Sequence, residues 1–207
     1  MPTALERPIV RIPSLKTRRA PKQHKYTAEE FFGLDFPEHE KWELVDGVLV
    51  KMPSPEKIHQ LLLKILIVEI ELWLRKHPIG ELIPDWDVKF LTFDTRRPDL
   101  VFGLFKDSRL KRGRHGEGTP DFLVEIISPG GAKRDLVEKR LFYEKCGVQE
   151  YWVIDPLHRN IHLFQPDASG RYIETVLNSG SVKSKLLKGF TVKLNDLFKV
   201  IDEYDGK

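Results

Sequence analysis

The 207-residue sequence has only one cysteine, Cys146, and no long apolar run. A single thiol excludes an internal disulfide and makes a reducing, cytoplasmic compartment the default expectation. The most apolar stretch, residues 65–68, is bounded by Lys64 and Glu69. No segment therefore approaches the ~20 apolar residues of a membrane-spanning helix, and we expect no membrane partner.

Acidic residues are scarce at the start of the chain. Residues 1–25 hold one acid, Glu6, against seven bases, which are Arg7, Arg11, Lys16, Arg18, Arg19, Lys22 and Lys25. The whole chain has 34 Lys and Arg and 31 Asp and Glu, so residues 26–207 keep 27 bases and 30 acids. The net charge of +3 therefore comes from this basic arm. Such an arm can bind polyanions through counterion release, although a flexible, solvated extension explains it more simply.

The rest of the composition is that of an ordinary globular chain, with 41% hydrophobic and 31% charged residues. This length suits one domain with a sizeable core. We expect a basic, flexible arm over residues 1–25, a single domain over 26–200 and a tail over 201–207.

Strand and helix patterns follow one another from Tyr26 onward. Residues 42–52 predict two strands about an Asp46–Gly47 turn. Ser54–Pro55 predicts the N-terminus of a helix that ends near Lys76, where Pro78 and Gly80 stop it. A second helix is expected over 133–146, ended by Gly147, and further strands over 86–93, 98–105, 121–127, 150–155, 160–165 and 171–177, with a short helix over 194–198. The order helix, three strands, helix, strand implies an α/β fold around a mixed sheet.

Two carboxylates in these strands are the first candidates for chemistry. Glu125 interrupts the apolar run 122–127, and Asp99 follows Pro98 at the start of an earlier strand. In an antiparallel hairpin, a register that pairs Phe105 with Thr119 places Asp99 opposite Glu125, with Cβ atoms ~5 Å apart on one face. Buried carboxylates that close repel each other unless a cation is shared.

A divalent cation would resolve this conflict, and oxygen ligands favour Mg²⁺ or Mn²⁺. We therefore predict that Asp99 and Glu125 bind such an ion. An alternative of equal weight is that Asp99 caps its strand while Glu125 pairs with a lysine or an arginine.

Lys139 is the candidate general base or charge stabiliser. The first two turns of helix 133–146 can lie over the end of the Glu125 strand, which brings Lys139 near the acids. Lys133 and Arg134 are alternatives, and a surface pair between Asp135 and Lys139 explains this spacing equally well.

The connection 106–118 is rich in basic residues and glycine, which favours a mobile loop. It lies at the far end of the hairpin from the acids, ~20 Å away at the rise of a strand. That distance suits contacts with a nucleic-acid backbone, although a solubilising loop is equally consistent. The candidate contacts are Arg109, Lys111, Arg112 and Arg114.

Four further polar residues have simpler structural explanations. His59 is expected to be a structural hydrogen-bonding residue, and Asp155, before Pro156, to end a strand. Asp85 and Asp87 either face the site or are charges at a strand edge.

Several motifs together resemble the Uma family of restriction-endonuclease-like proteins. They are WELVDG, MPSPEKIHQ, RPDLVF, PDFLVEIISP, DLVEKRLFYEKCGVQEYWVIDP and KSKLLKGFTVKLNDLF, and they span residues 26–198. The resemblance implies the PD-(D/E)XK nuclease fold, a mixed β-sheet flanked by helices with an αβββαβ core.

The resemblance also implies roles for particular residues. Pro98–Asp99 matches the P-D element, and Glu125 matches the second acid. The sequence departs from the motif where Ile127 stands in place of lysine, and Lys139, with Asp135, resembles the D-x-x-x-K run of the family. Glu43 matches an early glutamate of the family, and Glu69 is its rival.

The function implied is Mg²⁺-dependent endonucleolytic hydrolysis of DNA, with Asp99 and Glu125 as metal ligands and Lys139 and Glu43 as further catalytic residues. A homodimer would suit cleavage of both strands. The main alternative is a catalytically weak or inactive nucleic-acid-binding module on the same fold, which the Ile127 departure favours. A hydrolase of another ester is a third hypothesis.

Overall fold

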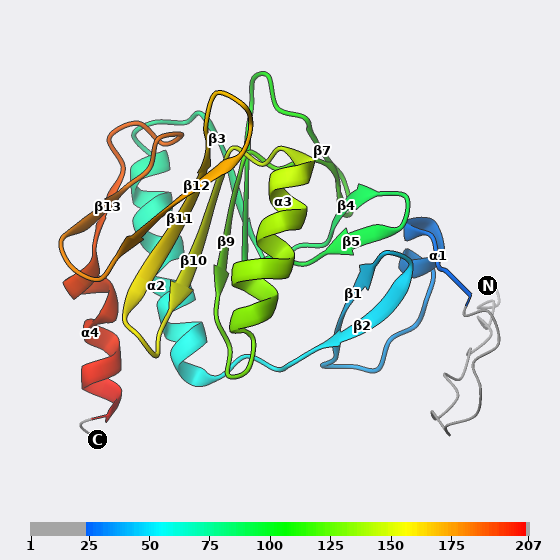
Figure 1. The fold of residues 1–207 in the computed structure, drawn as a ribbon, viewed down its shortest axis with the longest axis horizontal. Helices are drawn as coiled ribbons and strands as arrows, with labels where there is room; N and C mark the ends of the chain where they lie inside the picture. Colours follow the sequence, from blue (N-terminus) through cyan, green and yellow to red (C-terminus); the bar gives the residue numbers. More distant parts are fainter. Residues whose placement is uncertain (1–23, 206–207) are drawn as a thin grey trace, which may run out of the picture.

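The computed structural model describes residues 24–205, which form a layered α/β fold (Figure 1). Residues 1–23, and so most of the predicted basic arm, lie outside the described residues. A mixed six-stranded sheet lies at the centre, and only its third and fourth strands run parallel to each other. In spatial order the strands are β12 (Tyr172–Leu177), β11 (Asn160–Pro166), β10 (Glu150–Asp155), β9 (Phe122–Ile126), β6 (Leu100–Leu104) and β3 (Gly80–Pro84).

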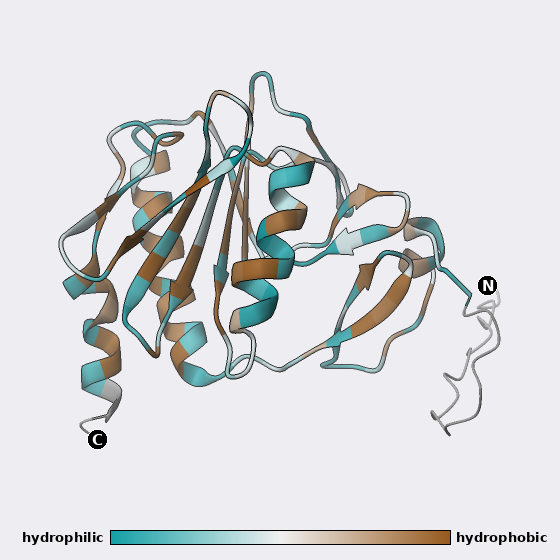
Figure 2. Ribbon diagram, in the orientation of Figure 1, coloured by the Kyte–Doolittle hydropathy of each residue, from teal (hydrophilic) through white to brown (hydrophobic). Residues whose placement is uncertain are grey.

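Helices cover both faces of this sheet. The helices α2 (Lys57–Leu74) and α4 (Leu194–Asp205) pack on one face. A π-helix, η1 (Arg134–Lys139), continues directly into α3 (Arg140–Cys146), which packs on the other face. Alternate residues of a strand point to opposite faces, so each central strand contributes to both apolar layers. Figure 2 shows this pattern as hydrophobic residues along the central strands and inner helix faces.

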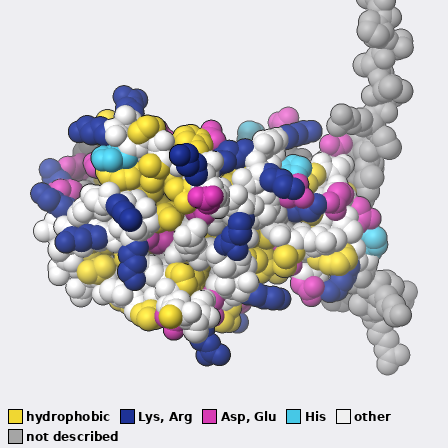
Figure 3. All heavy atoms as spheres, turned by 90° about the horizontal axis from the view of Figure 1, so that it is seen from above, with side chains coloured by type: hydrophobic (Ala, Val, Ile, Leu, Met, Phe, Trp, Pro, Cys, Tyr) yellow, Lys and Arg dark blue, Asp and Glu magenta, His cyan; other side chains and the backbone are white. Residues whose placement is uncertain are grey.

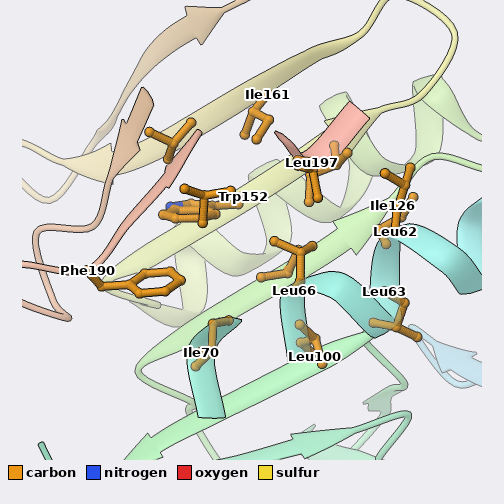
Figure 4. Close-up of a cluster of buried hydrophobic side chains, with 14 of the residues drawn as sticks. Leu62, Leu63, Leu66, Ile70, Leu100, Ile126, Trp152, Ile161, Phe190 and Leu197 are labelled. Carbon is orange, nitrogen blue, oxygen red and sulfur yellow. The ribbon is translucent and has the colours of Figure 1, made fainter. Parts of the chain in front are cut away.

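The larger core lies between the sheet and α2 with α4. Figure 4 shows Leu62, Leu66 and Ile70 of α2 packed toward Trp152 of β10 and Leu197 of α4. The smaller core on the α3 side contains Tyr143, Tyr151 and Val153, which are all fully buried. Glu125 belongs to this second layer, because its neighbours Val124 and Ile126 face the first.

A second six-stranded sheet lies beside the central one, together with α1 (Ala28–Phe32). Its first hairpin turns at Asp46 and Gly47, whose φ angles are 48° and 77°, as the predicted Asp46–Gly47 turn requires. In spatial order its strands are β2 (Val48–Met52), β1 (Lys41–Val45), β5 (Asp94–Arg96), β4 (Val88–Leu91), β8 (Gly116–Gly118) and β7 (Leu110–Arg112), and a separate ribbon pairs β13 (Ser181–Lys183) with β14 (Thr191–Lys193).

The predicted order of elements is confirmed, but its first strand was wrongly placed. The strand expected over 86–93 belongs to the second sheet as β4, whereas β3 covers residues 80–84, where no strand was expected. The αβββαβ core is therefore α2, β3, β6, β9, η1 with α3, and β10. The expected cap at Ser54 was also wrong, because α2 begins at Lys57 after Glu56, which makes no side-chain cap.

Two other expectations need correction. The connection 106–118 contains β7 and β8, so it forms a hairpin of the second sheet rather than one continuous loop. The short helix expected over 194–198 is α4, which continues to Asp205 and crosses the predicted boundary at residue 200. The division into arm, domain and tail stays a prediction. Among the described residues, no helix has both the length and the apolar character needed to cross a membrane.

Candidate active site

The pairing of β6 with β9 brings Asp99 and Glu125 together. The register pairs Leu100 with Val124 and Phe102 with Phe122, as the sequence predicted. One further step places Asp99 opposite Glu125, and both residues line a single cavity at this edge of the sheet. Antiparallel pairing thus joins two acids that lie far apart in the chain.

Asp99 is fixed at the entry to β6 by bonds to two other elements. Its Oδ2 accepts a hydrogen bond from the backbone N–H of Ile126 at 2.7 Å. The same oxygen lies 2.9 Å from Nε2 of His59 in the first turn of α2. His59 therefore acts as a hydrogen-bonding residue, as expected, and its partner is a candidate metal ligand. The Asp99 side chain remains 16% exposed, so it can still reach a ligand in the cavity.

Glu125 is neutralised by a lysine in this structure. Its Oε1 accepts hydrogen bonds from Nζ of Lys139 at 2.7 Å and from the hydroxyl of Tyr143 at 3.1 Å. Nζ of Lys139 also lies 3.3 Å from Oε1 of Glu43 and 3.7 Å from Oδ1 of Asp135. Of the two interpretations of Glu125, the geometry matches pairing with a lysine. A metal ion between Asp99 and Glu125 stays a prediction.

Of the three basic candidates in the helix after β9, Lys139 is the one that contacts Glu125. Lys139 is the last residue of η1, and the wider π turn, a feature frequent at functional sites, carries it and Asp135 on the side that faces the sheet. Lys133 points to solvent, with 80% of its side chain exposed and Glu138 as its partner. Arg134 lines the cavity, and its Nε makes no hydrogen bond within the described residues but lies 3.7 Å from Oδ1 of Asp135.

The cluster carries more negative than positive charge. Three carboxylates with at most 5% of their side chains exposed, Glu43, Glu125 and Asp135, share one ammonium. Burial raises the pKa of Glu125 well above its usual value, and Lys139 opposes this only in part. Burial raises the pKa of Asp135 for the same reason. Burial would lower the pKa of Lys139, but the surrounding carboxylates outweigh it and raise this pKa, so the ammonium stays charged.

The other acids considered from the sequence are distributed around this cluster. Glu43 is buried beside it and accepts a hydrogen bond from the backbone N–H of Arg97 at 3.0 Å, whereas its rival Glu69 lies on an exposed face of α2. Asp85 lines the cavity and pairs with Lys41 at 2.6 Å. Asp87 does not line the cavity, and it accepts a hydrogen bond from Nε of Arg97 at 2.7 Å.

The candidate nucleic-acid contacts lie away from this cluster. Arg109, Lys111, Arg112 and Arg114 are all exposed. Arg109 donates to the carbonyl of Gly147, and Arg112 donates to the carbonyl of Leu104 at 2.8 Å. The face shown in Figure 3 carries Lys and Arg side chains scattered among acidic and apolar ones. These four bases lie on or beside β7 of the second sheet, and their contact with nucleic acid stays a prediction.

Sequence reasoning missed two features of the site. Asp135 was considered only for its spacing from Lys139, yet its Oδ1 is buried without a hydrogen-bond partner within residues 24–205. The bond between His59 and Asp99 was also missed. Only the His59 position near a predicted helix N-terminus hinted at it, and no sequence pattern links it to Asp99.

Comparisons with known proteins agree with this architecture. A family model described as "Uma2: Putative restriction endonuclease" matches residues 28–195. The chain also resembles the crystal structure of a "putative nuclease belonging to DUF820" from Anabaena variabilis, with a TM-score of 0.70 and 21% identity. That similarity covers 84% of this chain and 97% of the other, and it supports the restriction-endonuclease-like fold. A comparison with curated proteins gives no match.

Proposed function

Because this chain belongs to the Uma2 family, we propose that it is a metal-dependent endonuclease that hydrolyses phosphodiester bonds in DNA. The observation that carries the proposal is the convergence of Asp99, Glu125, Asp135 and Lys139 on one cavity. Such a cluster of buried acids around a lysine is expensive for folding and suits phosphoryl chemistry.

The donor set suits Mg²⁺ or Mn²⁺. Asp99 and Glu125 offer carboxylate oxygens to the cavity, and the buried Oδ1 of Asp135 has no hydrogen-bond partner within the described residues. Oxygen donors are the ligands that these ions prefer. Within residues 24–205 no three His, Cys, Asp or Glu residues are already placed to hold a metal ion. The ammonium of Lys139 lies among the carboxylates instead, so we propose that ion binding adjusts their positions.

Each residue of the cluster has a proposed role. A divalent ion held by Asp99 and Glu125 would lower the pKa of a bound water and offset charge on the scissile phosphate. Lys139 is a charge stabiliser rather than a general base, because its raised pKa keeps the ammonium protonated. Glu43 orients Lys139, to which it is held at 3.3 Å. Arg134, at the cavity wall, is placed to bind a phosphate oxygen.

Contacts with the backbone of the substrate would come from the second sheet. We propose that the exposed side chains of Lys111 and Arg114 bind phosphates away from the cut. Arg109 and Arg112 can do so only by giving up bonds to Gly147 and Leu104. Their substitution should therefore weaken DNA binding less than that of Lys111 and Arg114.

Nicking of supercoiled plasmid with Mg²⁺ or Mn²⁺ tests the catalytic proposal. Asp99→Asn should abolish nicking, because the amide keeps an acceptor for Ile126 N–H but loses the charge that binds the ion. Glu69→Gln is the matched control. Glu69 is exposed on α2, so this substitution should leave nicking unchanged. Equal activity in Asp99→Asn and the wild type would exclude Asp99 as a metal ligand.

The alternative function is a nucleic-acid-binding module without catalysis. The observation that favours it is the position of Lys139, whose ammonium already neutralises Glu125 and competes with any metal ion. If fluorescence anisotropy shows that the wild-type protein binds DNA, but the protein does not nick plasmid with Mg²⁺ or Mn²⁺, this alternative is the correct one.

A further inference from the structure

A second cavity adjoins the carboxylate cluster and shares two residues with it, His59 and Ser128. Its volume is about 500 Å³, within the usual range of sites for small organic groups. The cavity lies where the start of α2, the segment after β9, the β10–β11 turn and α4 come together at one end of the sheet (Figure 1). Much of its wall is apolar, formed by Ile58, Ile127, Pro129, Pro156, Leu157 and Ile201.

His59 lines both cavities, and its two ring nitrogens have different surroundings. The residue is 6% exposed, and Nε2 is bonded to Asp99. Nδ1 is buried and has no hydrogen-bond partner among the described residues. Leaving a buried polar atom unpaired costs free energy, so such an atom calls for an explanation. A ligand with a polar edge in the second cavity would satisfy this nitrogen, beside the candidate metal ligand Asp99, once the atoms that cover Nδ1 move aside.

The β10–β11 turn holds an apolar side chain at the rim of this cavity. Leu157 is 84% exposed, although large apolar side chains are normally buried. Oδ1 of Asp155 accepts hydrogen bonds from the backbone N–H groups of Leu157 at 2.9 Å and His158 at 3.1 Å. Arg159 ties the turn to α4 through Asp202 at 2.7 Å. The turn therefore presents Leu157 in a fixed position, ready to pack on the face of a ligand.

We propose that this cavity is a subsite for one nucleobase, that of the nucleotide next to the scissile phosphate. The proposal rests on the proposed nuclease function and names the part of the substrate that lies beside the cut. A nucleobase has flat apolar faces, which suit Leu157 and Ile127, and a polar edge, which suits Nδ1 of His59. Both cationic side chains at the rim are paired internally, His158 with Asp155 and Arg159 with Asp202, and the exposed carboxylate of Glu56 would repel a phosphate, so the cavity favours a base over a phosphate.

The test uses 2-aminopurine deoxyriboside 5′-monophosphate, whose fluorescence reports stacking of its base, titrated into the full-length protein without added metal. We expect a saturable change that the four natural deoxynucleoside monophosphates reverse by competition. Deoxyribose 5-phosphate, which lacks the base, should not reverse it. Leu157→Ala should weaken binding of the probe about tenfold, because the mutation removes most of an apolar side chain that packs on the base. Leu72→Ala is the matched control, because Leu72 is a half-exposed leucine on α2 outside this cavity.

Three outcomes would overturn the proposal. They are the absence of a saturable change, equal competition by deoxyribose 5-phosphate, and unchanged probe binding in Leu157→Ala. Plasmid nicking, measured in parallel, separates this proposal from the proposed function. Probe binding that depends on Leu157, without nicking by the wild type, would keep the base subsite and reject the nuclease. Nicking without probe binding would keep the nuclease and reject the base subsite.

Discussion

Replacement of Lys139 by methionine should lower the free energy of unfolding and should increase the stabilisation that a bound metal ion provides. Methionine keeps most of the apolar stem of the lysine but removes the ammonium shared by Glu43, Glu125 and Asp135. Breaking a buried ion pair by removing one partner costs about 3–5 kcal/mol. With a urea m-value of about 2 kcal/mol/M, this lowers the urea midpoint by about 2 M.

Urea unfolding followed by tryptophan fluorescence measures this cost, because Trp152 is fully buried in the core. Lys133→Met is the matched control on the same helix. Its pair with Glu138 is exposed, so the loss should stay below about 1 kcal/mol. The double variant Lys139→Met/Glu125→Gln should be more stable than Lys139→Met alone, because one uncompensated carboxylate is removed.

Urea unfolding in the presence of Mn²⁺ tests whether the ammonium and a metal ion occupy the same position. Without the ammonium, the carboxylates lose their internal cation, so Mn²⁺ should stabilise Lys139→Met more than it stabilises the wild type. A loss of stability no larger than that of Lys133→Met would refute the view that Lys139 neutralises a buried acidic cluster. An equal effect of Mn²⁺ on both proteins would refute a shared position for the ammonium and the metal ion.

The remaining predictions concern pH, the single thiol and one turn. Burial raises the pKa of Glu125 and Asp135, so protons compete with a metal ion for these carboxylates. Calorimetry should therefore show that Mn²⁺ binds more tightly and releases fewer protons as pH rises. An Mn²⁺ affinity that does not change with pH would contradict this. The same raised pKa values mean that the folded, metal-free protein binds more protons than the unfolded chain. Its free energy of unfolding should therefore fall as pH rises through these pKa values, and urea titrations in which this free energy rises with pH would be inconsistent with the prediction. Burial raises the pKa of Cys146 to about 11, so alkylation by iodoacetamide near neutral pH should be far slower than that of a free thiol, as mass spectrometry can measure. Gly118 has a φ of 105°, and an added Cβ would lie 2.2 Å from the carbonyl oxygen of Arg109, so Gly118→Ala should lower the melting temperature clearly, and an unchanged value would contradict the geometry.

Parts of the site were predictable because they depend on local pattern. Apolar runs at 100–104 and 122–126 indicated two central strands, and the requirement that side chains share a face gave their register. Gly147 ended the second helix as predicted, with a φ of 76°. Other parts depended on competition between similar segments. Residues 86–93 were predicted as the first strand of the core, and only packing decided that residues 80–84 join the central sheet in their place.

The sequence by itself determined the order of elements, the two strands that carry Asp99 and Glu125, and the following helix with its basic candidates. These follow from periodicity and turn chemistry, which act over a few residues. Only the tertiary structure decided that Lys139 neutralises Glu125, that Glu43 and Asp135 share its ammonium, and that His59 connects Asp99 to a second cavity. Apart from the Asp135–Lys139 pair, these contacts join segments that are distant in the chain, and the free energy of all of them depends on burial and charge that no local pattern specifies.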